Sequence, residues 1–196
     1  MSPKAKPEKL ALHGGDPAKK TPFTTGPKHN LAEWEAIKPI FERGKINMTR
    51  GPEVMALREK FQKLFGMKYA VTTSSGTAAL HTALGALEIG RGDEVITSPI
   101  TDMGTLVAIL AQNAVPIFAD VDPLTLEITP DTIEAKITKH TRAILVVHLA
   151  GLPADMKGIM RLARRHRIKV VEDMAQSYLC KQGDRYCGTF GAFGCW

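Results

Sequence analysis

The chain has 196 residues, of which 44% are hydrophobic and 23% are charged, so it can bury a sizeable core and is neither disordered nor fibrous. Its net charge of +6 comes largely from the first 20 residues and from residues 161–167. No nucleic-acid motif or aromatic interleaving accompanies these charges, so we expect a small acidic substrate rather than DNA or RNA.

Neither a membrane span nor a secretion signal is expected. The uncharged run at residues 70–87 is broken by polar residues, and the Lys- and Pro-rich start has no apolar segment behind it. Cys180, Cys187 and Cys195 are odd in number and form no C-x-x-C pair, which indicates reduced thiols rather than disulfides or a metal site. We interpret the protein as cytoplasmic.

The N-terminal third predicts an arm followed by two helices. Residues 1–30 are rich in proline and are expected to form an extended arm of the kind that packs on a neighbouring subunit. Apolar side chains at helical spacing predict a helix over 31–43 and, after a turn-rich link at 46–52, a second helix that ends at Gly66.

A candidate phosphate site follows. Residues 69–73 are predicted to form a short strand that runs into Ser74-Ser-Gly-Thr77 and then into an apolar helix. Free N–H groups at a helix start attract anions, and Gly76 would let a phosphate approach the backbone. The alternative is an ordinary Ser or Thr N-cap. The turn lacks the sequence of a P-loop or of a dinucleotide fingerprint.

Strands and helices alternate through the remainder of the chain. Strands are predicted at 94–97, 115–118, 143–147 and from 168, with helices at 102–113, 130–137 and 155–167. This spacing predicts βαβ units and a three-layer α/β fold, in which helices cover both faces of a mostly parallel sheet. We expect one domain over 31–196 without an internal boundary.

The stretch at residues 168–176 ends an apolar strand with two adjacent carboxylates, Glu172 and Asp173. Open parallel sheets bind their ligands at this end of a strand, although an Asp there also serves to cap a turn. Residues 188–194 predict a turn that feeds another strand. The sequence ends at Trp196 within that strand, so we expect the chain to be cut off inside its domain.

Several motifs in this order resemble the DegT/DnrJ/EryC1/StrS aminotransferases, from about Leu10 to the last residue. They are Ser75-Gly-Thr77, Asp120-Val-Asp122, Val147-His-Leu-Ala-Gly151, Glu172-Asp-Met-Ala-Gln176 and Gly188-Thr-Phe-Gly-Ala-Phe-Gly194. The resemblance implies the fold-type-I architecture and the cofactor pyridoxal 5′-phosphate (PLP). The segments at 9–17 and 148–156 look most like the branch that acts on cyclitols and aminohydroxybenzoate precursors.

The resemblance also implies roles for individual residues. Asp173 would pair with the pyridinium nitrogen and Gln176 would hydrogen-bond the phenolic oxygen of the ring. The Ser75-Gly76-Thr77 turn would hold the phosphate through the N–H groups of Gly76 and Thr77. His148 is left out of the catalytic set, and Glu172 is expected to make structural hydrogen bonds.

Two departures from the family pattern stand out. Asp102 occupies the position where the family stacks an aromatic ring on the cofactor, so Met103 or an aromatic elsewhere would have to cover that ring. The family's Schiff-base lysine is expected beyond Trp196, because neither Lys169 nor Lys181 occupies the matching place. No catalytic residue is therefore assigned within the chain, which we expect to be inactive alone.

The function implied by the resemblance is transfer of an amino group from glutamate or glutamine to a keto sugar or keto cyclitol, in polysaccharide or secondary-metabolite biosynthesis. The full-length enzyme is expected to be a homodimer. One alternative is a dehydratase of the same family. Another is a non-catalytic, truncated protein that keeps the PLP fold and binds a ligand or partner.

Overall fold

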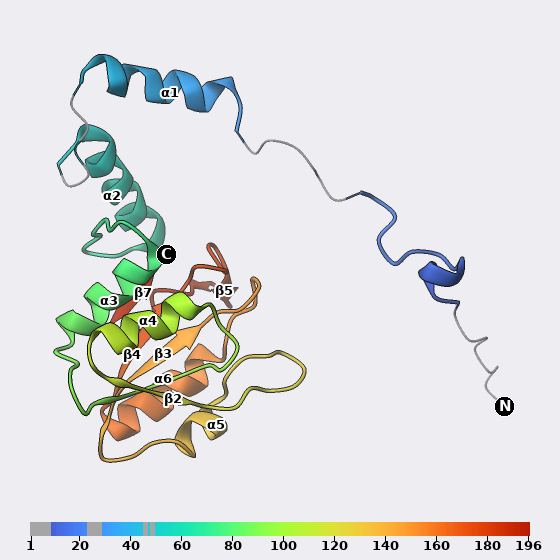
Figure 1. The fold of residues 1–196 in the computed structure, drawn as a ribbon, viewed down its shortest axis with the longest axis vertical. Helices are drawn as coiled ribbons and strands as arrows, with labels where there is room; N and C mark the ends of the chain where they lie inside the picture. Colours follow the sequence, from blue (N-terminus) through green and yellow to red (C-terminus); the bar gives the residue numbers. More distant parts are fainter. Residues whose placement is uncertain (1–8, 23–28, 45–46, 48–49) are drawn as a thin grey trace. The chain divides into compact units, whose positions relative to one another are not determined.

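The computed structural model describes residues 9–22, 29–44, 47 and 50–196 (Figure 1). Contacts divide the chain into two compact units, residues 1–46 and 47–196. Parts of the expected arm, at 1–8 and 23–28, and positions 46, 48 and 49 of the expected link at 46–52 lie outside the described residues. No helix in the described ranges is long and apolar enough to span a membrane.

The first unit contains a short 3-10 helix, η1 (Ala11–His13), and the predicted helix α1 (Leu31–Glu42). Asn30 caps α1, because its side chain accepts a hydrogen bond from Ala32 N and its backbone N–H donates to Glu33. Most apolar side chains of α1 are exposed, including Leu31 at 77% and Phe41 at 63%. Within this unit the helix therefore has an unburied apolar stripe.

The second unit is built on a five-stranded, wholly parallel sheet in the order β2-β1-β3-β4-β7. The strands are β1 (Glu94–Thr97), β2 (Val115–Phe118), β3 (Thr141–Val147), β4 (Lys169–Asp173) and β7 (Phe193–Cys195). β3 lies at the centre, and its residues from Ala143 to Val147 are all buried because helices cover both faces of the sheet. The three-layer α/β prediction is confirmed.

Two pairs of helices form the outer layers (Figure 1). On one face, α3 (Gly76–Ala86) and α4 (Met103–Ala111) pack through Leu84 and Ile109 onto the sheet. On the other face, α5 (Pro130–Glu134) and α6 (Met156–His166) pack through Ile133 and Ile159. The order of the strands reverses between β1 and β3, which places a ligand-binding position at the carboxyl ends of these strands.

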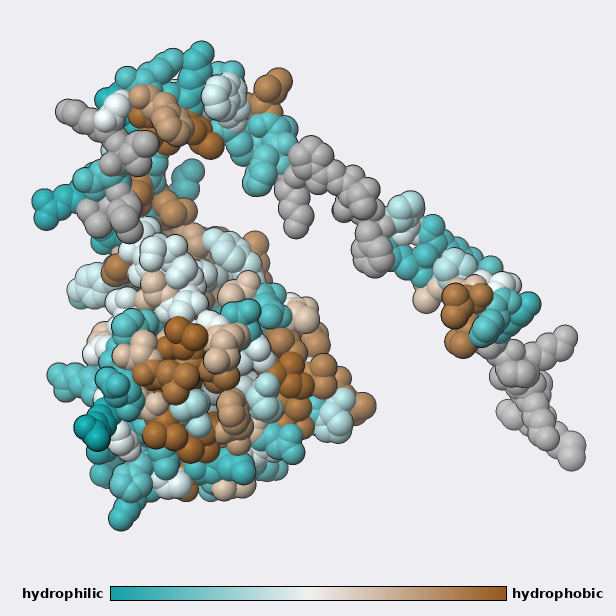
Figure 2. Space-filling model, viewed as in Figure 1, coloured by the Kyte–Doolittle hydropathy of each residue, from teal (hydrophilic) through white to brown (hydrophobic). Residues whose placement is uncertain are grey.

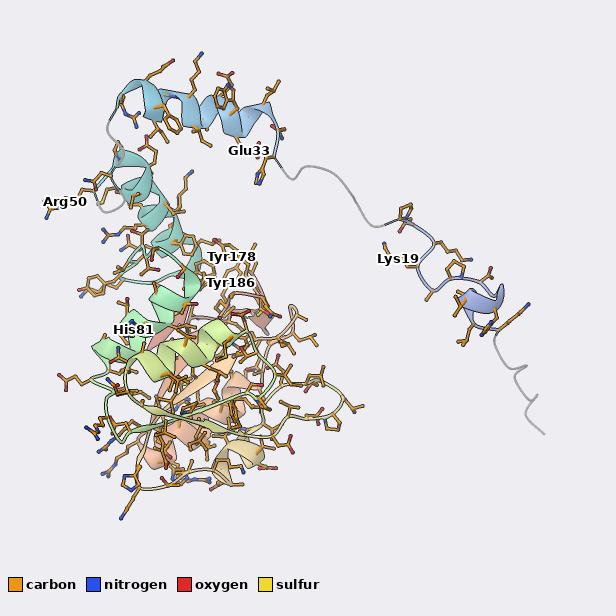
Figure 3. All side chains as sticks on the ribbon, viewed as in Figure 1. Lys19, Glu33, Arg50, His81, Tyr178 and Tyr186 are labelled. Atoms are coloured by element: carbon orange, nitrogen blue, oxygen red, sulfur yellow. The ribbon has the colours of Figure 1, made fainter. Side chains whose placement is uncertain are left out.

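Helix α2 (Pro52–Phe65) ends at Gly66, whose φ of 65° is the left-handed conformation that glycine adopts freely. Its Phe65 ring lies 4.5 Å from the Trp196 ring and 5.2 Å from that of Tyr186, measured between centroids. The Phe61 ring packs edge to face on Tyr178, with 6.1 Å between the ring centroids. Tyr178 and Tyr186 are labelled in Figure 3. Aromatic packing therefore holds α2 against the last residues of the chain.

The structure differs from several predicted elements: η1 lies in the arm that was expected to be extended, and α4 covers Met103–Ala111 rather than 102–113. Residues 69–73 form no strand, and Tyr69 and Val71 are 73% and 74% exposed, because no described strand offers them a hydrogen-bonding partner. Helix α5 is three residues shorter than predicted, since its last turn tightens into i to i+3 hydrogen bonds. A hairpin of β5 (Lys181–Gln182) and β6 (Arg185–Tyr186) was not predicted.

The three cysteines are free thiols, and their reactivity provides a test of the packing. Cys187 and Cys195 are 0% and 5% exposed, and burial raises the pKa of both thiols, that of Cys195 to about 12. We expect the folded chain at pH 7.5 to resist iodoacetamide at both residues, whereas all three thiols react after unfolding in urea. Mass spectrometry of the labelled peptides checks this, and rapid labelling of folded Cys187 would contradict the buried packing.

Candidate functional site

Asp173 ends β4 as a buried carboxylate that is only 5% exposed. Its Oδ2 accepts a hydrogen bond from the Thr105 hydroxyl at 2.9 Å, and its Oδ1 accepts one from Ala175 N at 3.1 Å. No cation pairs with it within the described ranges, and burial raises its pKa. Because an unpaired buried charge is costly, a cationic group of a ligand would offset this cost.

The start of α3 leaves two N–H groups free. Ser75 is the N-cap, and its Oγ accepts from Ala78 N at 3.1 Å, so the N-cap interpretation of this turn holds. Among the residues described here, Gly76 N and Thr77 N have no acceptor, as expected for the first turn of a helix. A Cβ at Gly76 would meet no atom within 4 Å, so the backbone there is open to an anion.

The first turn of α4 joins this turn to Asp173. A Cβ added to Gly104 would collide with the Thr77 hydroxyl, so α3 and α4 approach closely at their N-termini. The next residue, Thr105, is 2% exposed and makes the hydrogen bond to Asp173. The structure therefore brings Ser75, Gly76 and Thr77 to the same edge of the sheet as Asp173. The sequence analysis did not predict Thr105 as a site residue. The one signal for it is that a polar residue stands on the buried face of a helix.

Gln176 lies on the turn after β4, beside the loop that follows β3. Its Oε1 accepts a hydrogen bond from Ala150 N at 3.2 Å. The amide orientation that fits this bond leaves the NH2 group of Gln176 as a donor, because an amide N–H cannot accept from a backbone N–H. A donor in this position suits an anionic oxygen on a ligand.

Glu172 and His148 make a buried structural network. Both Glu172 oxygens accept backbone N–H groups, with Gly188 on Oε2 and Phe190 and Gly191 on Oε1, each at 2.7 Å. His148 Nε2 lies 3.2 Å from Glu172 Oε2, and its Nδ1 accepts from Ala154 N. Glu172 therefore makes structural hydrogen bonds, as expected, and fixes the loop that leads into β7.

A group of potential metal ligands adjoins this network. His148, Cys180 and Cys187 offer nitrogen and sulfur atoms within 4.8 Å of one another. The lone pair of the His148 imidazole is already occupied by Ala154 N–H, while the other ring nitrogen donates to Glu172. A metal ion would have to break one of these buried hydrogen bonds, so the arrangement favours a structural His148.

Asp102 is exposed and caps α4 by accepting a hydrogen bond from Gly104 N at 2.7 Å. Its role in the fold is therefore that of an N-cap, which an aromatic residue cannot fill. Met103 beside it is 61% exposed.

Neither of the two lysines nearest to this motif in the sequence lies at Asp173. Lys181 lies over the Tyr186 ring, 4.2 Å from its centroid, and Lys169 begins β4 at the opposite end from Asp173.

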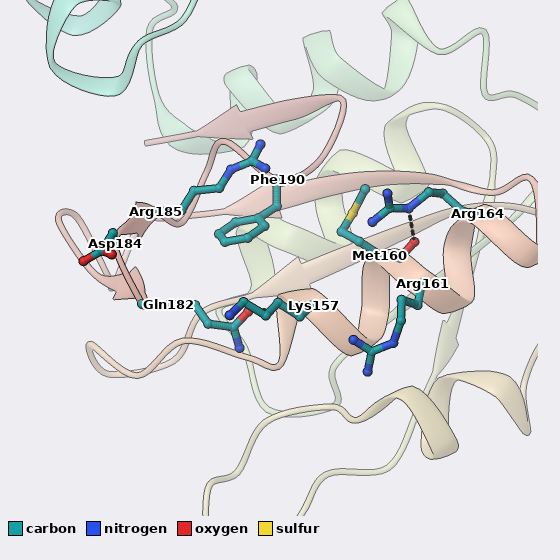
Figure 4. Close-up of a pocket in the computed structure, with 9 residues that line it drawn as sticks. Lys157, Met160, Arg161, Arg164, Gln182, Asp184, Arg185 and Phe190 are labelled. Atoms are coloured by element: carbon teal, nitrogen blue, oxygen red, sulfur yellow. Dashed lines mark hydrogen bonds between the residues drawn. The ribbon is translucent and has the colours of Figure 1, made fainter.

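A separate hollow of about 510 Å³ lies between α6 and the β5–β6 hairpin (Figure 4). It is lined by cationic side chains and by Phe190, and none of the residues around Asp173 lines it. Arg164 donates to Met160 O and Arg185 to the Thr189 hydroxyl, so two of the cations already have partners. The hollow is a solvated, basic face of α6 rather than part of the Asp173 site.

Comparisons with known proteins agree with this fold. The model of the DegT/DnrJ/EryC1/StrS aminotransferase family matches residues 28–196. A curated relative from Streptoalloteichus tenebrarius, the putative L-glutamine:3-amino-2,3-dideoxy-scyllo-inosose aminotransferase, is 40% identical over 187 residues. The match covers 94% of this chain and 45% of the relative.

Solved structures are similar as well. The aminotransferase from Psychrobacter cryohalolentis has a TM-score of 0.84 and 39% identity, over 88% of this chain and 44% of that chain. The Bacillus subtilis protein ntda, solved with bound cofactor PMP, has a TM-score of 0.74 and 35% identity, over 79% and 35% of the two chains. This chain thus spans less than half the length of each of these proteins.

Proposed function

Because the chain belongs to the DegT/DnrJ/EryC1/StrS aminotransferase family, we propose that it supplies the PLP-binding elements of a sugar or cyclitol aminotransferase. The observation that carries this proposal is the buried Asp173, which lacks a cationic partner among the described residues. A protonated pyridine nitrogen is a cation of the size and position that would complete this site.

Each residue of the site has a proposed task. Asp173 holds the proton on the ring nitrogen, which allows bound PLP to withdraw electrons from a substrate amine. Gly76 N–H and Thr77 N–H bind the phosphate at the positive end of α3, and Ser75 fixes the turn that presents them. Gln176 donates its NH2 to the phenolic oxygen. The open space at Gly76 and the donor at Gln176 fit this cofactor.

The proposed reaction moves an amino group from glutamate or glutamine to a keto sugar or keto cyclitol. The name of the curated relative, which specifies L-glutamine and a scyllo-inosose derivative, supports the cyclitol class. Neither Lys169 nor Lys181 lies at Asp173, so we propose that the 196-residue chain binds PLP but does not complete amino transfer.

For the full-length enzyme, the proposed assembly is a cytoplasmic homodimer. The exposed apolar stripe of α1 supports it, as does the hydrophobic surface over α4 in Figure 2, where Met103, Val107 and Leu110 are 61%, 44% and 50% exposed. The free thiols agree with a reducing compartment.

The proposed function is tested by titrating the 196-residue chain with PLP and following the absorbance of the ring. We expect saturable binding, with weaker binding of pyridoxal, which lacks the phosphate, because only PLP can use the N–H groups of Gly76 and Thr77. Assays with glutamate or glutamine and a panel of keto sugars and keto cyclitols should give no amino transfer. Equal affinity for PLP and pyridoxal would contradict the proposed phosphate site, and turnover by this chain would contradict its proposed inactivity.

A further inference from the structure

The loop after β3 is held by four consecutive backbone N–H groups, each bonded to a different acceptor. These bonds run from His148 N to Asp173 O, from Leu149 N to Glu127 Oε1, from Ala150 N to Gln176 Oε1 and from Gly151 N to Ser177 Oγ. Ala150 and Gly151 both have positive φ, at 50° and 89°. The surrounding side chains therefore impose an uncommon loop conformation, in which a non-glycine residue is left-handed.

Glu127 is the acceptor on one side of this loop. Its side chain comes from the connection between β2 and α5, is 4% exposed, and accepts Leu149 N–H at 2.7 Å. Burial raises the pKa of Glu127, and the hydrogen bond from Leu149 N–H opposes that rise. A hydrogen bond to a carboxylate is stronger than one to a neutral acceptor, so this 2.7 Å contact holds Leu149 N–H in place.

Gln176 lies on the other side of the loop. Ala150, the residue after Leu149, donates its N–H to Gln176 Oε1 and so determines which end of the amide faces away from the loop. If the loop moved, the amide could turn and present its oxygen instead of its NH2. The hydrogen bond of Leu149 N–H and the orientation of the Gln176 amide are therefore linked, because Leu149 and Ala150 are adjacent in the chain.

We propose that Glu127 is a positioning residue for the cofactor: by holding Leu149 N–H it keeps Ala150 N–H on Gln176 Oε1, so that the Gln176 NH2 group faces the phenolic oxygen of PLP. This inference rests on the proposed function. Glu127 itself does not touch the cofactor. Its effect reaches PLP only through the loop and Gln176.

The test compares Glu127→Gln, which keeps an oxygen acceptor, with Glu127→Met, which removes it. Glu134→Met, at an exposed position on α5, is the matched control. Hydrogen exchange of the Leu149 and Ala150 amides in the chain without ligand should rise in Glu127→Met and stay near wild type in the other two variants. This readout does not depend on cofactor binding.

Cofactor affinity is then measured for PLP and for its 3-O-methyl ether, which lacks the phenolate. Glu127→Met should weaken PLP binding about tenfold or more, as expected for loss of one hydrogen bond to a charged group, and should change binding of the ether less than twofold. Glu127→Gln should bind PLP within about twofold of wild type. In a Gln176→Ala background, Glu127→Met should have almost no further effect on PLP affinity.

The outcomes separate the two proposals. Equal weakening of PLP and the ether by Glu127→Met, or an undiminished effect in the Gln176→Ala background, would overturn the positioning role while leaving the proposed function intact. Unchanged amide exchange in Glu127→Met would also overturn it. A failure of the wild-type chain to bind PLP would overturn both.

Discussion

Replacing Asp173 with Asn is expected to weaken PLP binding by the 196-residue chain at least tenfold. The variant keeps the shape of the side chain but removes the negative charge that would pair with the protonated ring nitrogen, at a residue that is only 5% exposed. Removal of one partner of a buried charged pair costs about 2 kcal/mol or more. Titration by absorbance measures the affinity, and the chemical shift of ¹⁵N in labelled PLP reports whether the ring nitrogen is protonated at pH 8.

The control is Asp120→Asn, which makes the same change at an exposed carboxylate just beyond the end of β2. It should bind PLP like the wild-type chain. If the Asp173 and Asp120 variants bind equally well, and the ring nitrogen stays protonated in both, Asp173 does not hold the cofactor.

The Asp173 variant should also change the pH dependence of stability. Burial raises the pKa of Asp173 in the folded chain, so the folded state holds a proton that the unfolded state releases. The contribution of this group to the free energy of unfolding therefore falls as pH rises from the ordinary Asp pKa of about 3.9 to its raised value. Urea unfolding across this window should show a smaller decline for Asp173→Asn, and an identical decline would contradict the burial of a lone carboxylate.

Replacing Glu172 with Leu is expected to destabilise the fold severely, by about 3–5 kcal/mol. The change leaves the N–H groups of Gly188, Phe190 and Gly191 without their acceptor and removes the partner of His148 Nε2. Buried donors without acceptors account for most of this loss. Urea unfolding followed by circular dichroism measures it.

The matched control is Glu134→Leu, because Glu134 is an exposed carboxylate that pairs with Arg165 on the surface. Its loss should cost less than about 1 kcal/mol. Similar unfolding midpoints for the Glu172 and Glu134 variants would contradict the role of Glu172 in fixing the loop before β7.

Local sequence patterns were sufficient for much of the fold. Uninterrupted apolar runs predicted the buried strands β3 and β4, since a strand covered on both faces has no polar side. A Ser or Thr N-cap was the alternative interpretation of the turn at 74–77, and Ser75 is that cap because its side chain accepts from Ala78 N. The position of Asp173 at a strand end was also predicted locally, because the apolar run that begins at residue 168 stops at Glu172 and Asp173.

Contacts between distant segments were decided only by the tertiary structure. Thr105 and Asp173 are 68 residues apart, and Glu127 and Leu149 are 22 apart, so no local periodicity joins them. The expected strand at 69–73 failed for the same reason, because a strand needs a neighbour that the local sequence does not specify. The sequence by itself determined most of the helices and strands of the sheet domain, and it determined that Glu172 and Asp173 stand at the end of a strand. Packing of α3, α4 and the loop after β3 decided which of those residues meet, since close packing leaves each buried polar group few possible partners.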